Sequence, residues 1–257
     1  MALELGIRLS AVAGMVHKGN CIADIGCDHG FVSIALVQNR IADRVIACDI
    51  NKGPLAHAQK NVEVCGLEEK IDLRLCDGFA QVAPGEADGA VIAGMGGPLG
   101  LRILYDGRET VRKMNQIIFQ VQSKMALVRF ILSEWGFRTE EEIMVSEDGK
   151  FYPIMRLIPP ASKEFYEMQI PDFEAFLTAN EAQLCHASSD DICNYTYGKL
   201  LIESKSPALL IFLGKEEERL LSIVEKLEGN EENKDRLKEV CEEIDTLMLA
   251  KWKISGQ

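Results

Sequence analysis

The sequence predicts an open α/β sheet, mostly parallel with one antiparallel edge, followed by a helical region. Three observations predict this fold. Short β-branched segments alternate with helical patterns as far as Gly136. A strong hairpin signal, Asp148-Gly149, follows them. Apolar residues at helical spacing then dominate the chain from Lys215 to Trp252. Sheets of this kind bind ligands beyond the carboxyl ends of their strands, where the strand order reverses.

The predicted sheet has seven strands. Five are short apolar segments of the kind that is buried on both faces: "CIADIG", "RVIACDI", "IDLRLCD", "GAVIAG" and "NQIIFQV". The last two, "EEIMV" and "FYPIMRLI", flank the Asp148-Gly149 turn as an antiparallel edge hairpin. Helices are predicted over residues 3–17, over "GPLAHAQKNVEVCG" with Gly66 as its stop, and over "ALVRFILSEWGF".

A domain boundary is predicted at Pro159-Pro160, which separates residues 1–160 from residues 161–257. Residues 161–212 read as a polar connection with one or two short helices. Two helices, over 215–227 and 235–252 with a break at Gly229-Asn230, are predicted to pair as a coiled-coil hairpin. The apolar residues expected in their seam are Leu220, Val224 and Leu227 on the first helix, and Leu237, Cys241 (or Val240), Ile244, Met248 and Trp252 on the second.

The composition is that of a globular protein, with 47% hydrophobic and 26% charged residues in a chain of 257. The N-terminal segment lacks the apolar core of a signal peptide, and no run reaches the roughly 18 apolar residues that a membrane span needs. The eight cysteines form no C-x-x-C pair, which favours reduced thiols over disulfides or a zinc site. We therefore expect a cytoplasmic protein without a metal and without a membrane partner.

The net charge of −12 is uneven, since it is −3 up to Pro160 and −9 from Ala161 onward. An acidic tail repels nucleic acid unless its basic residues gather on one face. Any nucleic-acid contact is therefore expected from the first 160 residues. The basic residues that could form such a patch, although a solvated surface explains them equally well, are Arg102, Arg108, Arg112, Lys113, Lys124, Arg129 and Lys150.

A glycine-rich turn, in "ADIGCDHGFVSIAL" over residues 23–36, joins the first strand to a helix. A dinucleotide site needs G-x-G-x-x-G here, but the chain has Asp24-x-Gly26-x-x-x-Gly30. The acids Asp24 and Asp28 would repel a pyrophosphate, and they suit a ligand with positive charge and hydroxyl groups. S-adenosylmethionine has a sulfonium, an ammonium, ribose hydroxyls and no phosphate, so it fits this turn.

Two further carboxylates follow the next strands. Asp49 closes the second strand, where it could accept both ribose hydroxyls, and Asp77 closes the third, where it could receive the adenine N6 hydrogens. Each acid alone could be an ordinary strand-end or capping residue, but acids at three successive strand ends favour a cofactor site. The fourth strand ends in "IAGMGG", where backbone groups and the Met95 thioether would meet an acceptor. A glycine loop without a catalytic part is the alternative.

These motifs resemble those of the bacterial tRNA (adenine-22-N1)-methyltransferases. The resemblance rests on "ADIGCDHG", "CDINKGPLAHAQKNV", "CDGF", "IAGMGG" and "SEDGKFYPI", in this order within residues 5–158. It implies a Rossmann-like class I methyltransferase fold with a C-terminal coiled coil. It also implies S-adenosylmethionine as the donor and N1 of adenine 22, in the D arm of tRNA, as the acceptor. The family usually has Gln-Pro-Asn after the fifth strand, where this chain has Gln120-Val121-Gln122.

The candidate site residues form three groups. Cofactor binding is assigned to Asp24, Gly26, Gly30, Asp49, Ile50, Asp77, Gly78, Ala93 and Gly94. Catalysis is assigned to Gly94, Met95 and Asp28, with His29 as the runner-up, because a carboxylate could stabilise the positive charge that methylation places on the ring. Substrate binding is assigned to Gly96, Gly97, Arg102, Gln122, Lys150 and Tyr152, and to Arg8 by the resemblance alone. Phe79, Met95 and Tyr152 could offer apolar faces to an adenine splayed out of its stack.

Two other functions stay open at this point. A methyltransferase that acts on a small molecule or a protein, with the helical hairpin as a dimer interface, would suit the acidic surface. A non-catalytic nucleotide-binding module or an NAD-dependent oxidoreductase is the third hypothesis, and the missing G-x-G-x-x-G speaks against the oxidoreductase. The hairpin could clasp tRNA or serve packing alone, and we expect a monomer or a weak homodimer.

Overall fold

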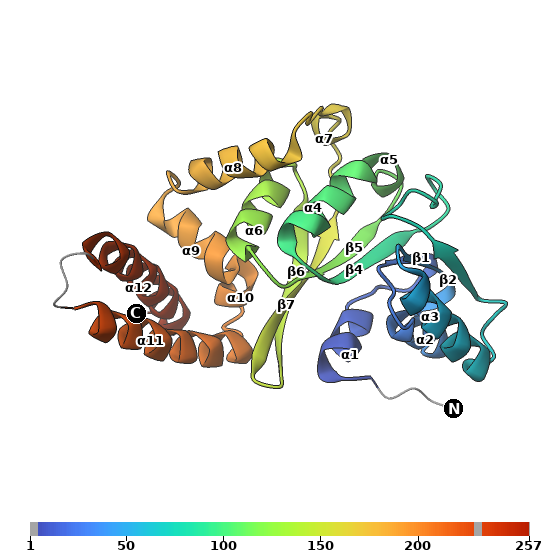
Figure 1. The fold of residues 1–257 in the computed structure, drawn as a ribbon, viewed down its shortest axis with the longest axis horizontal. Helices are drawn as coiled ribbons and strands as arrows, with labels where there is room; N and C mark the ends of the chain where they lie inside the picture. Colours follow the sequence, from blue (N-terminus) through green and yellow to red (C-terminus); the bar gives the residue numbers. More distant parts are fainter. Residues whose placement is uncertain (1–4, 229–232, 257) are drawn as a thin grey trace. The chain divides into compact units, whose positions relative to one another are not determined.

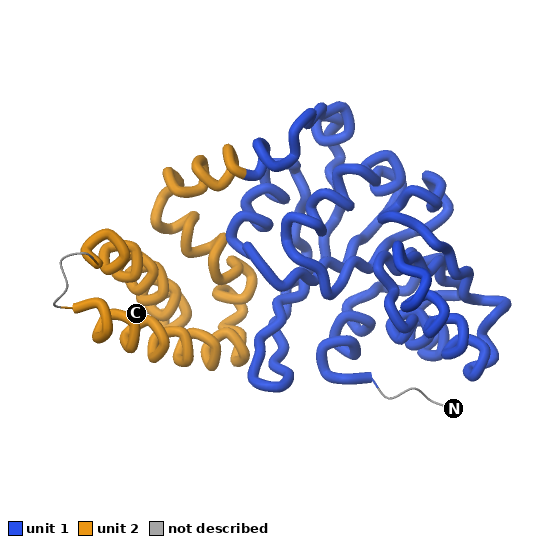
Figure 2. The backbone as a smooth tube through the Cα atoms, viewed as in Figure 1, with its two compact units in different colours: residues 1–177 blue, residues 178–257 orange. Residues whose placement is uncertain are grey.

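The computed structural model describes residues 5–228 and 233–256, which form two compact units, residues 1–177 and residues 178–257 (Figure 2). The strands of the first unit are β1 (Gly19–Ile25), β2 (Ala42–Asp49), β3 (Ile71–Leu75), β4 (Gly89–Met95), β5 (Gln116–Val121), β6 (Arg138–Glu147) and β7 (Lys150–Ile158). Its helices are α1 (Ile7–Gly14), α2 (Phe31–Gln38), α3 (Lys52–Cys65), α4 (Gly97–Asp106), α5 (Arg108–Val111), α6 (Met125–Glu134) and α7 (Glu164–Glu167). The chain passes from the first unit to the second within α8 (Phe173–Leu184).

The strands form one seven-stranded sheet in the order β3-β2-β1-β4-β5-β7-β6. The pairs among β1 to β5 are parallel, whereas β7 runs antiparallel to both β5 and β6. The predicted mostly parallel sheet with an antiparallel edge hairpin is confirmed. The order runs outward from β1 in both directions, first to β2 and later to β4, so the carboxyl ends of β1 and β4 flank the switch point where such sheets bind ligands.

Helices cover both faces of this sheet, which explains why its central strands are apolar throughout (Figure 1). On one face, Val12 of α1 and Ile34 and Leu36 of α2 are fully buried in a cluster that includes Ile118 of β5. On the other face, α4 and α6 pack side by side and bury residues such as Leu104. The turn between β6 and β7 has φ of +50° at Asp148 and +77° at Gly149, as the hairpin signal predicts.

Residues 161–212 differ from the prediction of a polar connection with one or two short helices. They contain α7, α8, α9 (Ser189–Tyr197), α10 (Lys199–Glu203) and the start of α11 (Pro207–Leu227). The part up to residue 177 belongs to the first unit, because the Phe165 and Phe176 rings lie 5.0 and 5.9 Å from the ring of Trp135, on the far side of Pro159-Pro160 in sequence. Packing of aromatic residues that are dispersed in the sequence thus orders a segment whose local pattern is weak.

In the second unit, α11 packs against α12 (Lys234–Ser255). The predicted break at Gly229-Asn230 lies outside the described residues. The seam predicted for α12 is wrong at Met248 and Trp252, which are 49% and 59% exposed. The buried residues are Val240, Leu247, Ala250 and Ile254. Buried positions 240, 247 and 254 are a heptad apart, so the seam is the adjacent stripe, one residue away on the helix.

In the part of the chain that the structure describes, no helix combines the length and the apolar character that crossing a bilayer requires.

Candidate functional site

The turn after β1 contains three residues in the left-handed region of backbone conformation. Gly26, Asp28 and Gly30 have φ of +74°, +50° and +73°. Glycine adopts this conformation without the steric cost of a Cβ, which explains the spacing of the two glycines in the motif. The backbone N–H groups of Gly26 and Cys27 donate to the carbonyl of Cys48 at 2.8 and 2.9 Å, so the turn is tied to the end of β2.

Asp49, the last residue of β2, holds the same turn from the side. Its Oδ2 accepts a hydrogen bond from the backbone N–H of Asp28 at 3.1 Å, and its Oδ1 accepts one from the N–H of Asn51 at 2.8 Å. The side chain is 7% exposed. Each carboxylate oxygen has a second lone pair, so Asp49 can still accept hydrogen bonds from a ligand hydroxyl.

Asp24 lies at the end of β1 and is only 4% exposed. Burial raises the pKa of Asp24 to about 6, although a 2.6 Å hydrogen bond donated by the Ser33 hydroxyl partly opposes this shift. A nearby negative charge, that of Asp49, also raises it. A buried carboxyl group with a pKa this close to neutrality is typical of functional sites.

Asp24 and the turn after β1 line a cavity of about 300 Å³ at the switch point of the sheet, whereas Asp49 holds the turn without lining the cavity. One wall comes from the turn after β1 and the other from the end of β4. The residues that line it are Arg8, Leu9, Asp24, Gly26, Cys27, Asp28, His29, Phe31, Val32, Ala93, Gly94, Met95 and Gln122. The structure therefore brings together nine of the predicted site residues from four separate segments of the chain.

Met95 and Gly26 meet at the floor of the cavity. A Cβ built on Gly26 would lie 2.4 Å from Cε of Met95, so the end of this side chain packs directly against the Gly26 backbone. Gly94 has φ of +83°, and the register between β4 and β5 shifts between Ala93 and Met95. This irregularity turns the Gly94 peptide out of the sheet toward the cavity, as β-bulges beside functional sites commonly do.

Arg8 reaches the cavity from the first turn of α1. Its Nη1 donates a 3.0 Å hydrogen bond to Oε1 of Gln120, and its guanidinium lies 5.5 Å from the centre of the Tyr152 ring. A Cβ on Gly94 would be 3.4 Å from the same Nη1. The cavity thus has carboxylates on the β1 side and a guanidinium on the β4 side, and it can hold a ligand that carries charges of both signs.

Residues 5–155 match the family model described as a methyltransferase domain. The chain belongs to this methyltransferase-domain family. The tRNA (adenine(22)-N(1))-methyltransferase of Bacillus subtilis (strain 168) is 28% identical over 248 residues, which are 95% of this chain and 96% of that protein. The crystal structure of the B. subtilis m1A22 tRNA methyltransferase has a TM-score of 0.75 at 28% identity, over 97% of this chain and 99% of that chain. A Streptococcus pneumoniae protein, reported as a candidate tRNA (m1A22) methyltransferase in complex with S-adenosyl-L-methionine, has a TM-score of 0.75 at 27% identity, over 98% of this chain and 100% of that chain.

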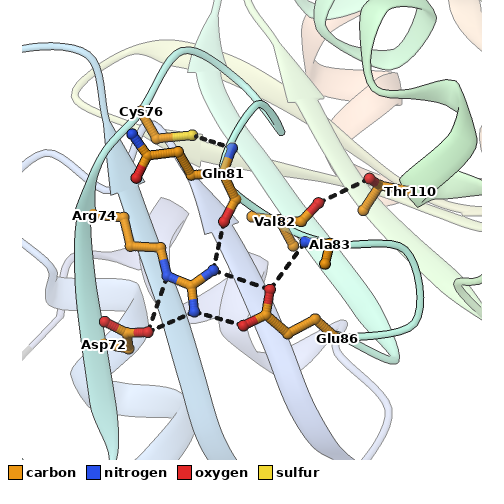
Figure 3. A network of polar contacts seen from close by, with 8 residues as sticks. All are labelled: Asp72, Arg74, Cys76, Gln81, Val82, Ala83, Glu86 and Thr110. Atoms are coloured by element: carbon orange, nitrogen blue, oxygen red, sulfur yellow. Dashed lines mark hydrogen bonds and ion pairs between the residues drawn. The ribbon is translucent and has the colours of Figure 1, made fainter.

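In this methyltransferase, the predicted residues Asp77 and Gly78 line a separate cavity of about 270 Å³, beside α4 and α5. The loop that carries them is held by Arg74 of β3 (Figure 3). Arg74 pairs with Asp72 on its own strand and with Glu86 at the far end of the loop, at 2.6 and 2.5 Å. Its hydrogen bonds hold the pKa of Glu86 down to about 2, so this ion pair persists across the neutral range.

Five predicted substrate-binding residues, Gly96, Gly97, Arg102, Lys150 and Tyr152, do not line the cavity of the methyltransferase. Gly96 and Gly97 start α4, where a Cβ on Gly97 would lie 2.4 Å from the Ser123 carbonyl, so Gly97 is needed for packing. Arg102 pairs with Asp106 and lies over the Phe173 ring, at 5.8 Å. Lys150 is exposed at the start of β7.

The other basic residues of the predicted patch also have structural partners. Arg108 and Arg112 lie 4.5 and 5.1 Å from the ring centres of Tyr105 and Tyr166, so they help to hold the segment with α7 on the first unit. Arg129 is buried in an ion pair with Glu142, at 2.7 Å, and cannot contact a nucleic acid; this part of the prediction is wrong. Phe79, predicted to face a base, is buried beneath Gly107.

Of the remaining predicted residues, His29 lines the cavity, whereas Ile50 and Tyr152 do not. Ile50 follows Asp49 and is 60% exposed, a position from which an apolar side chain could cover a ligand. Tyr152 supports Arg8 from below. His29 lies 3.6 Å from the carboxylate of Asp28 and stacks on the Phe31 ring at 5.5 Å.

Sequence reasoning missed Gln120 and Arg74 as parts of this site. A buried glutamine in an otherwise apolar strand, "QIIFQV", was the available signal for Gln120. The sequence gives no comparable signal for Arg74, because its partner Glu86 lies twelve residues away across a loop. Among residues 5–228 and 233–256, no three His, Cys, Asp or Glu side chains are grouped as a metal site requires.

Proposed function

We propose that this protein transfers the methyl group of S-adenosylmethionine to N1 of adenine 22 in tRNA. The observation that carries the proposal is the cavity at the switch point, where the acidic turn after β1 faces the Gly94-Met95 bulge and Arg8. Relatives similar over nearly the whole chain, one of which is the B. subtilis tRNA (adenine(22)-N(1))-methyltransferase and another a complex with the methyl donor, support it.

The donor is assigned to the acidic side of the cavity. The Asp24 carboxylate would lie near the α-ammonium group, and Asp49 would accept the ribose hydroxyls with its free lone pairs. Gly26 and Gly30 would let the nucleoside lie against the backbone. Ile50 would cover one face of the adenine, with Asp77 and Gly78 at its N6 edge. Ala93 and Gly94 would contact the donor from β4.

The reaction needs little from the protein beyond positioning. The lone pair of neutral adenine N1 attacks the methyl carbon, the bond from this carbon to the sulfonium sulfur breaks, and the sulfur keeps the electron pair as a neutral thioether. Holding the two atoms in near-attack geometry can account for several kcal/mol of the barrier. The product ring is cationic, and Asp28, whose side chain is 66% exposed at the mouth of the cavity, would stabilise this charge.

The acceptor is assigned to the opposite side. Met95 and Tyr152 offer apolar surfaces to an extruded base, and Gln122, whose N–H bonds to the Met95 carbonyl at 2.9 Å, places an amide at the edge of the cavity. Arg8 and Lys150 would contact the backbone phosphates. Catalysis is thus assigned to residues 1–160, and the helical region, residues 161–257, to an accessory role. The proposed place of action is the cytoplasm, and the proposed form is a monomer or weak homodimer.

The decisive experiment is methylation of unmodified tRNA with labelled donor, followed by digestion to nucleosides. We expect label in 1-methyladenosine. Label absent from tRNA but transferred to a small molecule or a protein would support the alternative acceptor, and binding of NADH without binding of S-adenosylhomocysteine would contradict any methyltransferase.

The roles of two carboxylates can be separated in the same assay. Asp49→Ala should weaken S-adenosylhomocysteine binding by tenfold or more, because it removes the proposed ribose acceptor and frees the turn at Asp28. Asp28→Ala should lower kcat while the affinity for S-adenosylhomocysteine, measured by calorimetry, stays within about threefold. If both substitutions affect binding alone, Asp28 does not have the proposed electrostatic role.

A further inference from the structure

Gln120 is a polar residue near the carboxyl end of β5, after the apolar residues 117–119, and it is fully buried (0% exposed). Its Oε1 accepts two hydrogen bonds, one from Nη1 of Arg8 at 3.0 Å and one from the backbone N–H of Gly94 at 3.2 Å. Its Nε2 donates to the carbonyl of Val121 at 3.2 Å. These three contacts fix which way the amide faces, since only the oxygen can accept and only the nitrogen can donate.

The guanidinium of Arg8 is held without being neutralised. Glu147 accepts a hydrogen bond from the backbone N–H of Arg8, at 3.3 Å, and in the described part of the chain no ion pair joins a carboxylate to the Arg8 guanidinium. The partners of that guanidinium are a neutral amide and the face of the Tyr152 ring. Its full positive charge is therefore available to an anion at the mouth of the cavity.

We propose that Gln120 is a positioning residue that holds the Arg8 guanidinium, uncompensated, beside the Gly94 bulge to bind a phosphodiester group of the nucleotide that carries the target base. The inference deepens the proposed function and rests on it. The Gln120 oxygen thereby connects two parts of the site. One is the Arg8 guanidinium, which would position the nucleic-acid backbone, and the other is the Gly94 peptide, which would border the donor.

Gln116 provides a matched control on the same strand. It lies four residues before Gln120, on the same face of β5, and is 6% exposed. Its Oε1 accepts from the N–H of His17 at 2.9 Å, and its Nε2 donates to the carbonyl of His17 at 2.7 Å. The two glutamines thus anchor the segment with α1 at both ends, but Gln116 binds backbone alone and touches no cavity residue in these contacts.

The test compares Gln120→Glu with Gln116→Glu in the full chain. A carboxylate at position 120 can still accept from Arg8 and Gly94, but it cancels the Arg8 charge. We expect tRNA affinity at moderate salt to fall at least tenfold, and the slope of log affinity against log salt to become shallower by about one phosphate contact. Affinity for S-adenosylhomocysteine should stay within about threefold. Gln116→Glu should leave tRNA affinity and the salt slope unchanged.

Two further variants separate positioning from general stability. In an Arg8→Met background, Gln120→Glu should weaken tRNA binding by less than about threefold, because Gln120 acts through Arg8. Gln120→Met has nearly the same length without charge, so it should keep the salt slope while lowering tRNA affinity and kcat severalfold. This variant also serves if Gln120→Glu does not fold.

The proposal is overturned if Gln120→Glu retains wild-type tRNA affinity, if its effect persists undiminished in the Arg8→Met background, or if Gln116→Glu reproduces it. These readouts are binding constants. A wild-type protein that binds tRNA without methylating adenine N1 would therefore contradict the proposed function and leave the role of Gln120 measurable. A wild-type protein that does not bind tRNA would overturn both.

Discussion

Asp24 is buried, and its neighbours do not compensate its charge fully. Its pKa of about 6 exceeds the value of about 3.9 expected in an unfolded chain, which corresponds to roughly 2–3 kcal/mol of lost stability for the ionised form. Because the folded-state pKa is raised, the stabilising contribution of the protonated carboxyl is present below pH 4 and is lost as the pH rises through about 6. A cationic ligand beside Asp24 would stabilise the ionised carboxylate and offset this loss.

This predicts a proton linkage in cofactor binding. The ammonium group of S-adenosylhomocysteine should lower the pKa of Asp24, so binding near pH 6 should release a fraction of a proton, and affinity should fall as the pH drops from 7 to 5. Calorimetry in buffers of different ionisation enthalpy measures both effects. Asp24→Asn should abolish the linkage, weaken binding, and raise the stability of the unliganded protein at pH 8 by about 1–3 kcal/mol. If Asp24→Asn releases the same fraction of a proton on binding, the proton comes from another group.

At the residue scale, sequence reasoning was most effective where chemistry is local. The Asp24, Gly26, Asp28 and Gly30 pattern lies within one turn, and the first three of these residues line one cavity. It was least effective where a contact is distant in sequence, as for Arg8 and Gln120, which are 112 residues apart. Arg108, Arg112 and Arg129 show the same limit, because a charge count cannot reveal that their partners are aromatic rings or a buried glutamate.

At the scale of elements, the loop from β3 to β4 depends on Arg74 (Figure 3). Arg74 also donates to the carbonyl of Gln81, and Glu86 accepts from the N–H of Ala83 at 2.9 Å. One guanidinium thus fixes both ends of the loop that presents Asp77. The low pKa of Glu86, about 2, means that this stabilisation is present above pH 4 and is lost only as the pH falls through 2.

Arg74→Met should therefore lower the free energy of unfolding by about 1–3 kcal/mol, with the same effect at every pH from 5 to 8. It should also weaken S-adenosylhomocysteine binding severalfold, because Asp77 loses its fixed position. Lys60→Met, at an exposed position on α3, is the control and should change neither quantity. Chemical denaturation and calorimetry measure the two effects. Equal effects from Lys60→Met would show that the Arg74 pairs have no special role.

In the helical hairpin, two neighbouring residues of α12 differ sharply in burial. Leu247 is 0% exposed in the seam of α12, whereas its neighbour Met248 is 49% exposed. Leu247→Ala should destabilise the second unit by about 2–5 kcal/mol through the cavity it leaves, and Met248→Ala by less than about 0.5 kcal/mol. Hydrogen exchange of the α12 amides in the full chain measures the difference. A larger loss of protection in Met248→Ala would restore the stripe predicted from the sequence.

The elements themselves were largely predictable because their patterns are strong. The seven strands and the β6–β7 hairpin follow from β-branched runs and one Asp-Gly turn. In α12 the sequence offers two adjacent apolar stripes, and periodicity alone does not choose between them. In the structure the buried stripe is accompanied by Lys251–Glu217 and Arg219–Glu243 ion pairs between the two helices. One or two short helices were predicted where the chain has α7 to α10, because aromatic packing and caps such as Ser188, which accepts from Asp191 N–H, define these helices more than periodicity does.

In the whole molecule, each compact unit has a net charge of −6, with 18 Lys+Arg against 24 Asp+Glu in residues 1–177 and 10 against 16 in residues 178–257. The helical unit is less than half as long, so its negative charge is denser, and contacts with a polyanion are expected mainly from the first unit. In that unit, Arg8 lines one side of the cavity at the switch point, and Asp24 and Asp28 line the other. The central proposal is that a methyl group is transferred at this cavity to the Watson–Crick edge of one adenine.

Primer extension on treated tRNA tests that claim most directly, since a methyl group on N1 blocks base pairing and stops reverse transcription. With the protein and S-adenosylmethionine, we expect a new stop immediately before nucleotide 22. The stop should be absent when S-adenosylhomocysteine replaces the donor and absent in a tRNA with guanine at position 22. A stop at another adenine, or no stop while the donor is consumed, would contradict the proposed reaction.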